Sequence, residues 1–394
     1  MIFIFTVVPG FSRPRSLVLP ASKPIDPQER NRPGDAIMKI AQVAPLYESV
    51  PPKLYGGTER VVSYITEELV KLGHEITLYA SGDSETSAGL RSVCERALRL
   101  DGGKLLSPLA HHLNLIETVA QDADEFDVVH FHLDYLPFSQ IRRLEIPSVT
   151  TLHGRLDIPD LYPLFREFDD MRLISISDAQ RAPMPWASWL TTVHHGIPED
   201  LHRPNYSKGE YLAFLGRISP EKRVDRAIEI ARLAGMPLRV AAKIDDADRN
   251  YFEEEISDLL ANSDVEFVGE IGEQDKTDFL GNAAALLFPI DWPEPFGLVM
   301  IESMACGTPV IAFRGGSVAE IIEPGVTGFV VENIEQAVEA VGRIDSIDRR
   351  ACHQRFLERF TSRRMCEQYL AAYERVIWEK KRATRETRGL TLTA

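Results

Sequence analysis

Two glutamates separated by seven residues, Glu294 and Glu302, are the first side chains in this sequence that could do chemistry. Glu302 is the only charged residue between Glu294 and Arg314, and helical spacing places it beside Leu298 and Ala305. Burying an unpaired carboxylate is very costly, and sugar or ribose hydroxyls could satisfy it by donating hydrogen bonds. A loop glutamate followed by a buried structural ion pair is an equally acceptable interpretation.

Two cations, Arg217 and Lys222, follow an apolar run that we expect to form a strand. Pro220 between them is placed as the first residue of the next helix. The helix dipole disfavours cations at that end, and a bound diphosphate would offset the repulsion. The alternative is two solvated surface cations.

A pair of glycines, Gly56 and Gly57, comes after the first expected strand and opens the first expected helix. Glycine lets a backbone approach a ligand closely, and a helix N-terminus favours negative charge. The dinucleotide fingerprint G-x-G-x-x-G is absent, and two glycines before a helix are mostly a simple turn, so the pair alone is weak evidence for a ligand.

A histidine, His153, follows another expected strand. Ligands of open α/β sheets bind at the carboxyl ends of the strands, which favours a functional role as much as a structural one. His130 and His132 end a second strand of the same domain and could line the same cleft.

Short β-rich apolar runs alternate with segments of helical period from Met38 onward, which is typical of βαβ units. We expect strands at 39–44, 75–80, 127–132, 148–152, 171–176, 190–194, 211–215, 238–243, 265–268, 285–288, 309–313 and 328–331. About a dozen strands exceed the eight of a barrel, so we predict an α/β fold with two doubly wound, Rossmann-like sheets in series. A single barrel with insertions is the alternative.

The pattern is interrupted at 203–209, where polar turn formers replace periodic residues. We therefore predict a first domain at 38–205 and a second at 206–360. The proline-rich residues 1–37 are expected to form a disordered extension. Residues 361–394 are expected to form a C-terminal helix, at about 361 to 382, that packs back towards the first domain, and then a tail. Met365, Tyr369 and Tyr373 recur on one side of that helix, so that side should pack on protein.

The composition excludes several classes of protein. Of 394 residues, 44% are hydrophobic and 26% charged, as in ordinary globular chains, and the net charge of −15 argues against nucleic-acid binding. Four cysteines without C-x-x-C spacing and no apolar run of membrane-spanning length favour a cytoplasmic protein. The D-x-D pairs Asp122/Asp124 and Asp246/Asp248 are interpreted as solvated helix faces, so we expect no metal site.

The order of these motifs resembles that of the retaining GT-B glycosyltransferases, the large family that includes bacterial mannosyltransferases and sucrose synthases. The resemblance rests on 293–302, on 305–311, on Gly216-Arg217 with Lys222, and on the pairs Gly56-Gly57, His153-Gly154 and Gly315-Gly316. It covers most of 38–380. One departure is the segment His194-His195-Gly196, where relatives often have an Asn-Gly pair.

The resemblance implies transfer of a sugar from a UDP-, GDP- or ADP-sugar to a sugar or lipid-linked acceptor, with retention and without a metal or cofactor. The donor would bind mainly the second domain, and the acceptor the first. By this resemblance, Arg217 and Lys222 would neutralise the leaving diphosphate, and Glu294, with His153, would contact the donor sugar. The implied donor-binding residues are Glu302 at the ribose, Phe296, Gly297 and Leu298 through their backbone amides, Gly56 and Gly57, and Glu270 and Ile271 near the base.

Other functions fit the same scaffold: a glycoside phosphorylase, a nucleotide-sugar epimerase, and a two-lobed sugar-binding protein without activity. Sequence leaves open which donor and acceptor are used, the oligomeric state, and a peripheral contact with the inner face of a membrane. It also leaves open whether retention proceeds by double displacement or by same-face internal return.

Overall fold

The computed structural model describes residues 37–53, 56–100, 107–144, 146–261 and 264–391. The extension expected at 1–37 therefore lies, apart from Ile37, outside the described residues. No helix among the described residues is long and apolar enough to span a membrane.

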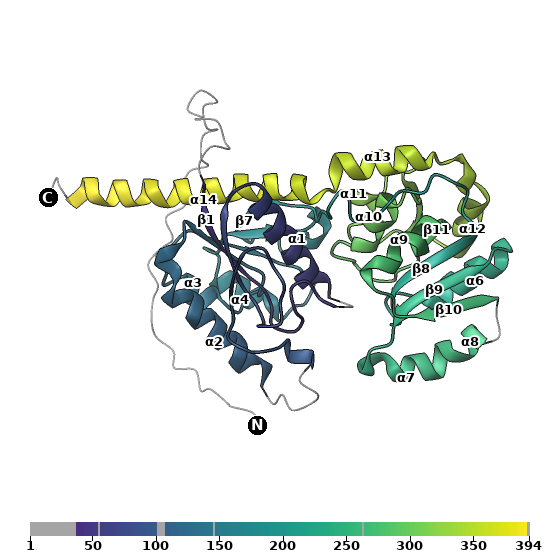
Figure 1. The fold of residues 1–394 in the computed structure, drawn as a ribbon, viewed down its shortest axis with the longest axis horizontal. Helices are drawn as coiled ribbons and strands as arrows, with labels where there is room; N and C mark the ends of the chain where they lie inside the picture. The colour runs from purple at the N-terminus through teal and green to yellow at the C-terminus, as the bar shows by residue number, and fades with distance from the viewer. Residues whose placement is uncertain (1–36, 54–55, 101–106, 145, 262–263, 392–394) are drawn as a thin grey trace. The chain divides into compact units, whose positions relative to one another are not determined.

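The first sheet contains seven parallel strands in the order β3-β2-β1-β4-β5-β6-β7. Figure 1 labels two of them, β1 and β7. Its strands are β1 (Lys39–Val43), β2 (Glu75–Tyr79), β3 (Gly89–Arg91), β4 (Val128–Phe131), β5 (Ser148–Thr151), β6 (Leu173–Ser175) and β7 (Trp189–Thr192). The α-helices between them are α1 (Gly57–Lys71), α2 (Pro108–Gln121), α3 (Phe138–Ile141), α4 (Leu161–Glu167) and α5 (Asp178–Arg181). The apolar side chains of β1 and β4 are buried, as expected for strands covered on both faces.

The second sheet contains six parallel strands in the order β10-β9-β8-β11-β12-β13. Its strands are β8 (Tyr211–Arg217), β9 (Leu238–Lys243), β10 (Val265–Gly269), β11 (Ala283–Phe288), β12 (Val310–Phe313) and β13 (Gly328–Val331). The α-helices from α6 onward are α6 (Val224–Ala234), α7 (Arg249–Tyr251), α8 (Ser257–Ala261), α9 (Glu273–Gly281), α10 (Leu298–Ala305), α11 (Val318–Ile321), α12 (Ile334–Gly342), α13 (Arg349–Arg359) and α14 (Ser362–Thr391). Two separate parallel sheets confirm the predicted fold class, and the single-barrel alternative is wrong.

The structure differs from the sequence analysis at two local points: one strand was missed, and one expected helix start is wrong. Strand β3 was not foreseen, because its three residues are all exposed and leave no pattern of buried positions. Pro220 does not begin the next helix: Ser219 to Lys222 form a turn, and α6 begins at Val224 after Arg223, whose φ is 54°. A left-handed residue at this point stops the helix from extending back to the proline.

Helix α14 packs against elements of the first sheet, contacting α1 and β5. Met365, Tyr369 and Tyr373 are buried along one side of it, as their spacing predicted. The helix is longer than expected and reaches Thr391. Its buried tyrosines hydrogen-bond to polar side chains of β1, β4 and β5.

Two chain segments that connect the two sheets, one at Ile197 and one at 360–362, lie side by side. The Ile197 amide donates to the Phe360 carbonyl (2.9 Å), and the Ser362 amide donates to the Ile197 carbonyl (2.8 Å). Gly196 lies against the second segment so closely that a Cβ atom there would be 2.2 Å from the carbonyl oxygen of Thr361. The crossing therefore requires glycine at 196.

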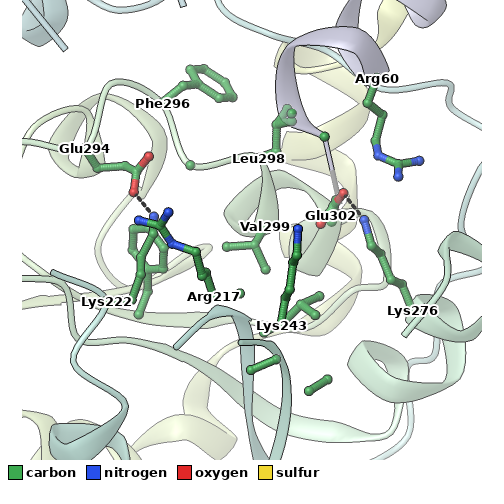
Figure 2. A pocket seen from close by; sticks show the side chains of 18 of the residues that line it. Arg60, Arg217, Lys222, Lys243, Lys276, Glu294, Phe296, Leu298, Val299 and Glu302 are labelled. Atoms are coloured by element: carbon green, nitrogen blue, oxygen red, sulfur yellow. Dashed lines mark hydrogen bonds and ion pairs between the residues drawn. The ribbon is translucent and has the colours of Figure 1, made fainter. Parts of the chain in front are cut away.

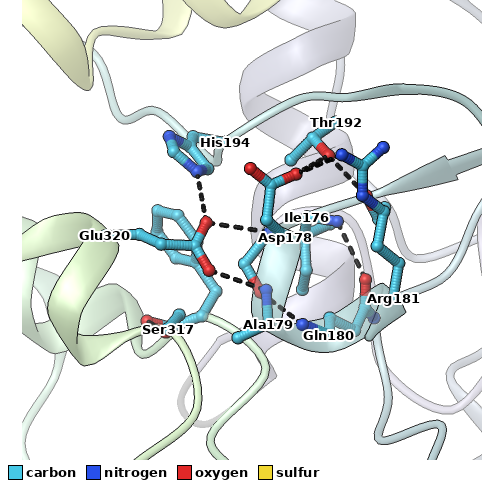
Figure 3. A network of polar contacts seen from close by, with 12 residues as sticks. Ile176, Asp178, Ala179, Gln180, Arg181, Thr192, His194, Ser317 and Glu320 are labelled. Atoms are coloured by element: carbon cyan, nitrogen blue, oxygen red, sulfur yellow. Dashed lines mark hydrogen bonds and ion pairs between the residues drawn. The ribbon is translucent and has the colours of Figure 1, made fainter. Parts of the chain in front are cut away.

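A second connection between residues of the two sheets centres on Glu320 of α11 (Figure 3). Its carboxylate accepts the backbone amides of Asp178 (2.8 Å) and Ala179 (2.7 Å), at the start of α5, and lies 3.1 Å from Nε2 of His194. Burial would raise the pKa of Glu320, but these hydrogen bonds outweigh it and lower the pKa below its ordinary value. Glu320 therefore stays ionised and holds α5 beside α11.

We predict that Gly196→Ala lowers the free energy of unfolding by about 1–3 kcal/mol, because the new methyl group overlaps the backbone at Thr361. The control is Gly342→Ala at the end of α12, where an added Cβ meets no atom within 4 Å. Urea unfolding of both variants checks this. Equal midpoints would show that the crossing tolerates a side chain.

Candidate active site

One pocket gathers the twelve residues that the sequence assigned to catalysis and donor binding, whereas His130 and His132, expected to line the same cleft, are buried and do not line it. The twelve residues are Gly56, Gly57, His153, Arg217, Lys222, Glu270, Ile271, Glu294, Phe296, Gly297, Leu298 and Glu302. They come from segments up to 246 positions apart in the chain (302 minus 56). The structure thus brings together what the sequence presents as scattered motifs.

Parallel strands explain this gathering, because their carboxyl ends lie on one edge of each sheet. Arg217 and Lys243 are the last residues of the neighbouring strands β8 and β9, which pair in register. Glu270 directly follows β10, and His153 lies two residues after β5. Gly57 begins α1, so the backbone amides of that first turn also face this edge.

Glu294 and Lys222 form an ion pair on the pocket wall (Figure 2). Glu294 also accepts a hydrogen bond from Nε1 of Trp292 at 3.0 Å. The ammonium of Lys222 lies 5.0 Å from the centroid of the Trp292 ring and 5.5 Å from that of Phe288. These contacts hold both charged ends in place, since each has an aromatic or ionic partner.

The Gly315-Gly316 pair acts on Glu294 through the backbone. Gly316 has a φ of 50°, and a Cβ atom there would be 2.1 Å from the carbonyl oxygen of Glu294. This close approach lets the Ser317 amide donate to that same oxygen at 3.0 Å. The glycine therefore positions the loop that holds Glu294.

Arg217 lies among carboxylates. It contacts Glu221, Asp245 at 3.7 Å and Asp248 at 3.3 Å. Lys243 also pairs with Asp245, at 2.8 Å. Asp248 is thus not on a solvated face, because the turn between β9 and α7 brings it to Arg217 at the end of β8. The expectation is wrong for Asp248 and for Asp122, which pairs with Arg91 and is 14% exposed, whereas the Asp246 side chain is 95% exposed as expected.

Glu302 is buried, with its side chain 4% exposed, and it has a cationic partner: Nζ of Lys276 lies 2.8 Å from its Oε1. Lys276 also contacts Glu273 at 3.0 Å, and Glu273 pairs with Arg60 of α1 at 2.6 Å. Burial would raise the pKa of Glu302, but Lys276, His202 and Arg60 outweigh it and lower the pKa. Glu302 is therefore an ionised carboxylate whose charge is already balanced.

Ligand atoms of His202, Glu273 and Glu302 lie within 4.8 Å of one another, a spacing that could hold a cation. The ammonium of Lys276 contacts both carboxylates and supplies the positive charge there. The cluster is accounted for as a buried ion-pair network.

His153 stacks on His195, with ring centroids 5.3 Å apart and an angle of 19° between the rings. His195 in turn meets the edge of Phe296 at 4.9 Å. Burial lowers the pKa of His153 to about 3 and that of His195 well below its ordinary value. Both imidazoles are neutral near pH 7, and the segment that departs from the family pattern supplies one of them.

Sequence reasoning missed four lining residues with an ionisable side chain: Arg60, His195, Lys243 and Lys276. Lys243 could have been found, since it ends a predicted strand. Arg60 lies in the first turn of the helix opened by the glycine pair. Lys276 gave no signal, because α9 reads as an exposed acidic helix until its contact with Glu302 is known.

Comparison with known proteins matches both halves of the chain to sugar-transferring families. Residues 55–214 match the model described as Glycosyltransferase Family 4, and residues 200–354 match that of Glycosyl transferases group 1. The chain is 25% identical over 370 residues to an N-acetyl-alpha-D-glucosaminyl L-malate synthase from Bacillus anthracis, covering 83% of this chain and 96% of that enzyme.

Two solved structures share the fold. AviGT4, a glycosyltransferase involved in avilamycin A biosynthesis, superposes with a TM-score of 0.66 at 24% identity, over 86% of this chain and 98% of that one. HepE from Anabaena, solved in complex with UDP and glucose, gives a TM-score of 0.67 at 18% identity, over 86% and 99% of the two chains.

We predict that Glu302→Gln lowers the free energy of unfolding at pH 7 by about 1–3 kcal/mol, since Lys276 loses one of its two carboxylates. The folded chain depresses the pKa of Glu302, so its stabilisation is present above the ordinary value of 4.5 and is lost as the pH falls through the lower folded pKa.

The difference between wild type and Glu302→Gln should therefore shrink on acidification below pH 4.5. Glu339→Gln, at an exposed position of α12, is the control and should change stability little at any pH. Chemical unfolding at several pH values measures the difference. A gap that stays constant with pH would contradict the ion-pair account.

Proposed function

We propose that this chain is a group 1 glycosyltransferase with the GT-B fold, and that it moves a sugar from a nucleotide-diphosphate donor to an acceptor with retention of configuration. The matches of its two halves to glycosyltransferase models and its fold support this proposal. Family membership, donor class, stereochemistry and residue roles are the proposal.

The observation that supports this most is the charge of the pocket. Five cationic side chains line it, Arg60, Arg217, Lys222, Lys243 and Lys276, against three carboxylates (Figure 2). This excess of positive charge is confined to the lining of a chain that carries −15. Behind the lining, Glu221, Asp245, Asp248 and Glu273 pair with four of these cations, so an anionic ligand would compete with them. Such a lining favours a ligand with several negative charges, and a nucleoside diphosphate meets that requirement.

Arg217 and Lys222 are proposed to stabilise the negative charge that develops on the diphosphate as it leaves. Both side chains are more than two-thirds buried, which strengthens their electrostatic effect in a site from which a bound donor excludes water. Fixed cations can perform the task that a divalent metal performs in other enzymes. We therefore propose a metal-independent transfer.

Glu294 is proposed to contact the hydroxyls of the donor sugar. Its carboxylate is held by Lys222 and Trp292. These contacts order the carboxylate and keep it from moving toward the anomeric carbon of a bound sugar. It is therefore assigned to sugar binding and charge stabilisation, not to covalent attack. Double displacement and same-face return both remain compatible with this assignment.

The remaining lining residues are proposed to bind the donor. Backbone amides at Phe296, Gly297 and Leu298 lie at the start of α10, a favourable place for phosphate or sugar oxygens. Glu302 is proposed to accept ribose hydroxyls in addition to its contact with Lys276. Gly56 and Gly57 would approach the donor from α1, and Glu270 with Ile271 would lie near the base.

The acceptor is proposed to be a sugar or a lipid-linked sugar held by residues 38–205. HepE was solved with UDP and glucose, which makes UDP-sugars the first donors to test, with GDP- and ADP-sugars beside them. We propose that the reaction takes place in the cytoplasm. For a lipid-linked acceptor, we also propose that the protein makes a peripheral contact with the inner face of the membrane.

A mass-spectrometric screen of these donors, with and without candidate acceptors, tests the proposal. We expect slow release of a nucleoside diphosphate from one donor class and faster release with the correct acceptor. Phosphate-dependent cleavage of a disaccharide would identify a phosphorylase, and donor consumption with a changed sugar epimer would identify an epimerase. Binding without any turnover would identify a sugar-binding protein.

We predict that Arg217→Ala and Lys222→Ala each lower kcat/KM by about a hundredfold or more, because each removes a preorganised charge from the transition state. Excess EDTA should leave wild-type turnover nearly unchanged. Arg239→Ala removes a cation on β9 that pairs with Glu266 outside the pocket, and it should retain full activity. Loss of activity on chelation, restored by Mn²⁺, would overturn the metal-independent mechanism.

We predict that Glu294→Gln chiefly lowers kcat, because the carboxylate matters most as positive charge develops at the anomeric carbon. Steady-state kinetics with the active donor measures the change. The matched control is Glu332→Gln, which removes an exposed carboxylate paired with Arg314 and should have no effect. A raised donor KM with unchanged kcat would reassign Glu294 to ground-state binding alone.

A further inference from the structure

Behind the pocket wall, a chain of buried polar side chains runs from His153 to α14. His153 Nε2 lies 2.8 Å from Nδ1 of His132, and His132 Nε2 lies 3.0 Å from Oε1 of Gln42. Gln42 Nε2 donates to the Tyr373 hydroxyl at 3.1 Å. Gln42 and His132 are 0% and 2% exposed, so water does not substitute for these contacts.

The same chain continues beyond Tyr373. Its hydroxyl lies 2.7 Å from Nδ1 of His130, and His130 Nε2 lies 2.7 Å from Oγ1 of Thr151. The Thr151 hydroxyl donates to Tyr369 at 3.2 Å. Burial lowers the pKa of His130 and of His132 well below the ordinary value, so each ring is neutral and has one donor and one acceptor nitrogen.

These contacts determine the direction of every hydrogen bond. The Thr151 hydroxyl is used toward Tyr369, so it accepts from His130 Nε2, and the bare Nδ1 of His130 accepts from Tyr373. Tyr373 oxygen then accepts from the amide nitrogen of Gln42.

That leaves the amide oxygen of Gln42 to accept from Nε2 of His132. The bare Nδ1 of His132 consequently accepts from Nε2 of His153. Nδ1 of His153 is therefore unprotonated. It is buried and has no hydrogen-bond partner among the described residues, on a ring that lines the pocket.

We propose that Gln42 is a positioning residue: through His132 it fixes His153 in the Nε2-protonated tautomer, which leaves Nδ1 as a buried, unpartnered hydrogen-bond acceptor on a ring that lines the pocket. An acceptor pairs with a hydroxyl or an amide N–H and repels a phosphate oxygen. The tautomer assignment depends only on the buried contacts. Its use by a hydroxyl of the donor sugar rests on the proposed function.

Ring ¹⁵N NMR of the full chain tests the tautomer without any ligand, because the protonated and bare nitrogens of a neutral imidazole resonate far apart. In wild type we expect His132 and His153 to be protonated at Nε2 alone between pH 6 and 8. Gln42→Met keeps the size but removes the amide, and His153 should then populate both tautomers. Ser175→Ala removes a partly buried hydrogen bond to Thr192 elsewhere in the sheet and is the control, with no expected change.

A proton on Nδ1 of His153 in wild type would overturn the proposal, as would an unchanged His153 in folded Gln42→Met. If Gln42→Met does not fold, Tyr373→Phe provides the same test, because it removes the acceptor that orients the Gln42 amide. The wild-type spectrum is decisive in either case.

The use of the acceptor is tested separately by two substitutions of His153. Asparagine places an amide near the position of Nδ1 and can still accept there, whereas glutamine places its amide near Nε2. We expect the donor KM of His153→Asn to stay within roughly tenfold of the wild-type value. We expect the donor KM of His153→Gln to rise by more than roughly tenfold. If His153→Asn and His153→Gln have equal kinetics while the NMR spectrum shows the predicted tautomer, the ligand contact is refuted and the tautomer assignment stands.

Discussion

Parallel pairing of every strand in both sheets is the constraint on which the pocket depends. It places the last residues of β8 and β9, Arg217 and Lys243, side by side. It also places the residues that follow β5 and β10 at the edge where the carboxyl ends of the strands of each sheet lie. Helices that start at such an edge, α1 and α10, add backbone amides to it. The direction and order of the strands therefore bring these positions together, whichever side chains occupy them.

Charge in this pocket is stabilised in pairs and networks, since isolated buried charges would be too costly. Lys222 pairs with Glu294 and Lys276 with Glu302, while Arg217 lies among three carboxylates. A diphosphate entering the pocket would share these cations with the carboxylates instead of meeting free ones. The arrangement therefore favours a ligand whose phosphates replace part of an existing network, which ties donor binding to local rearrangement of the ion pairs.

Much of the fold could be predicted from the sequence, because buried parallel strands and amphipathic helices leave periodic patterns. The end of β9 follows from such a run, and that of β1 to within one residue, which places the glycine pair. Strand β8 extends two residues past the predicted 215, so that Arg217 ends the strand instead of following it. The residue roles remain predictions. What escaped prediction depends on contacts between distant segments: Lys276 beside Glu302, Asp248 folded toward Arg217, and the exposed strand β3.

Binding of nucleotides to the wild-type chain tests the central claim, that this pocket is built for a nucleoside diphosphate, most directly. Calorimetric titration would compare UDP, GDP and ADP with their own monophosphates at low and high salt. The account predicts that one diphosphate binds at least about tenfold more tightly than its monophosphate, and that this advantage decreases as salt screens the charges. Equal affinity for the diphosphate and the monophosphate of every base, independent of salt, would contradict it.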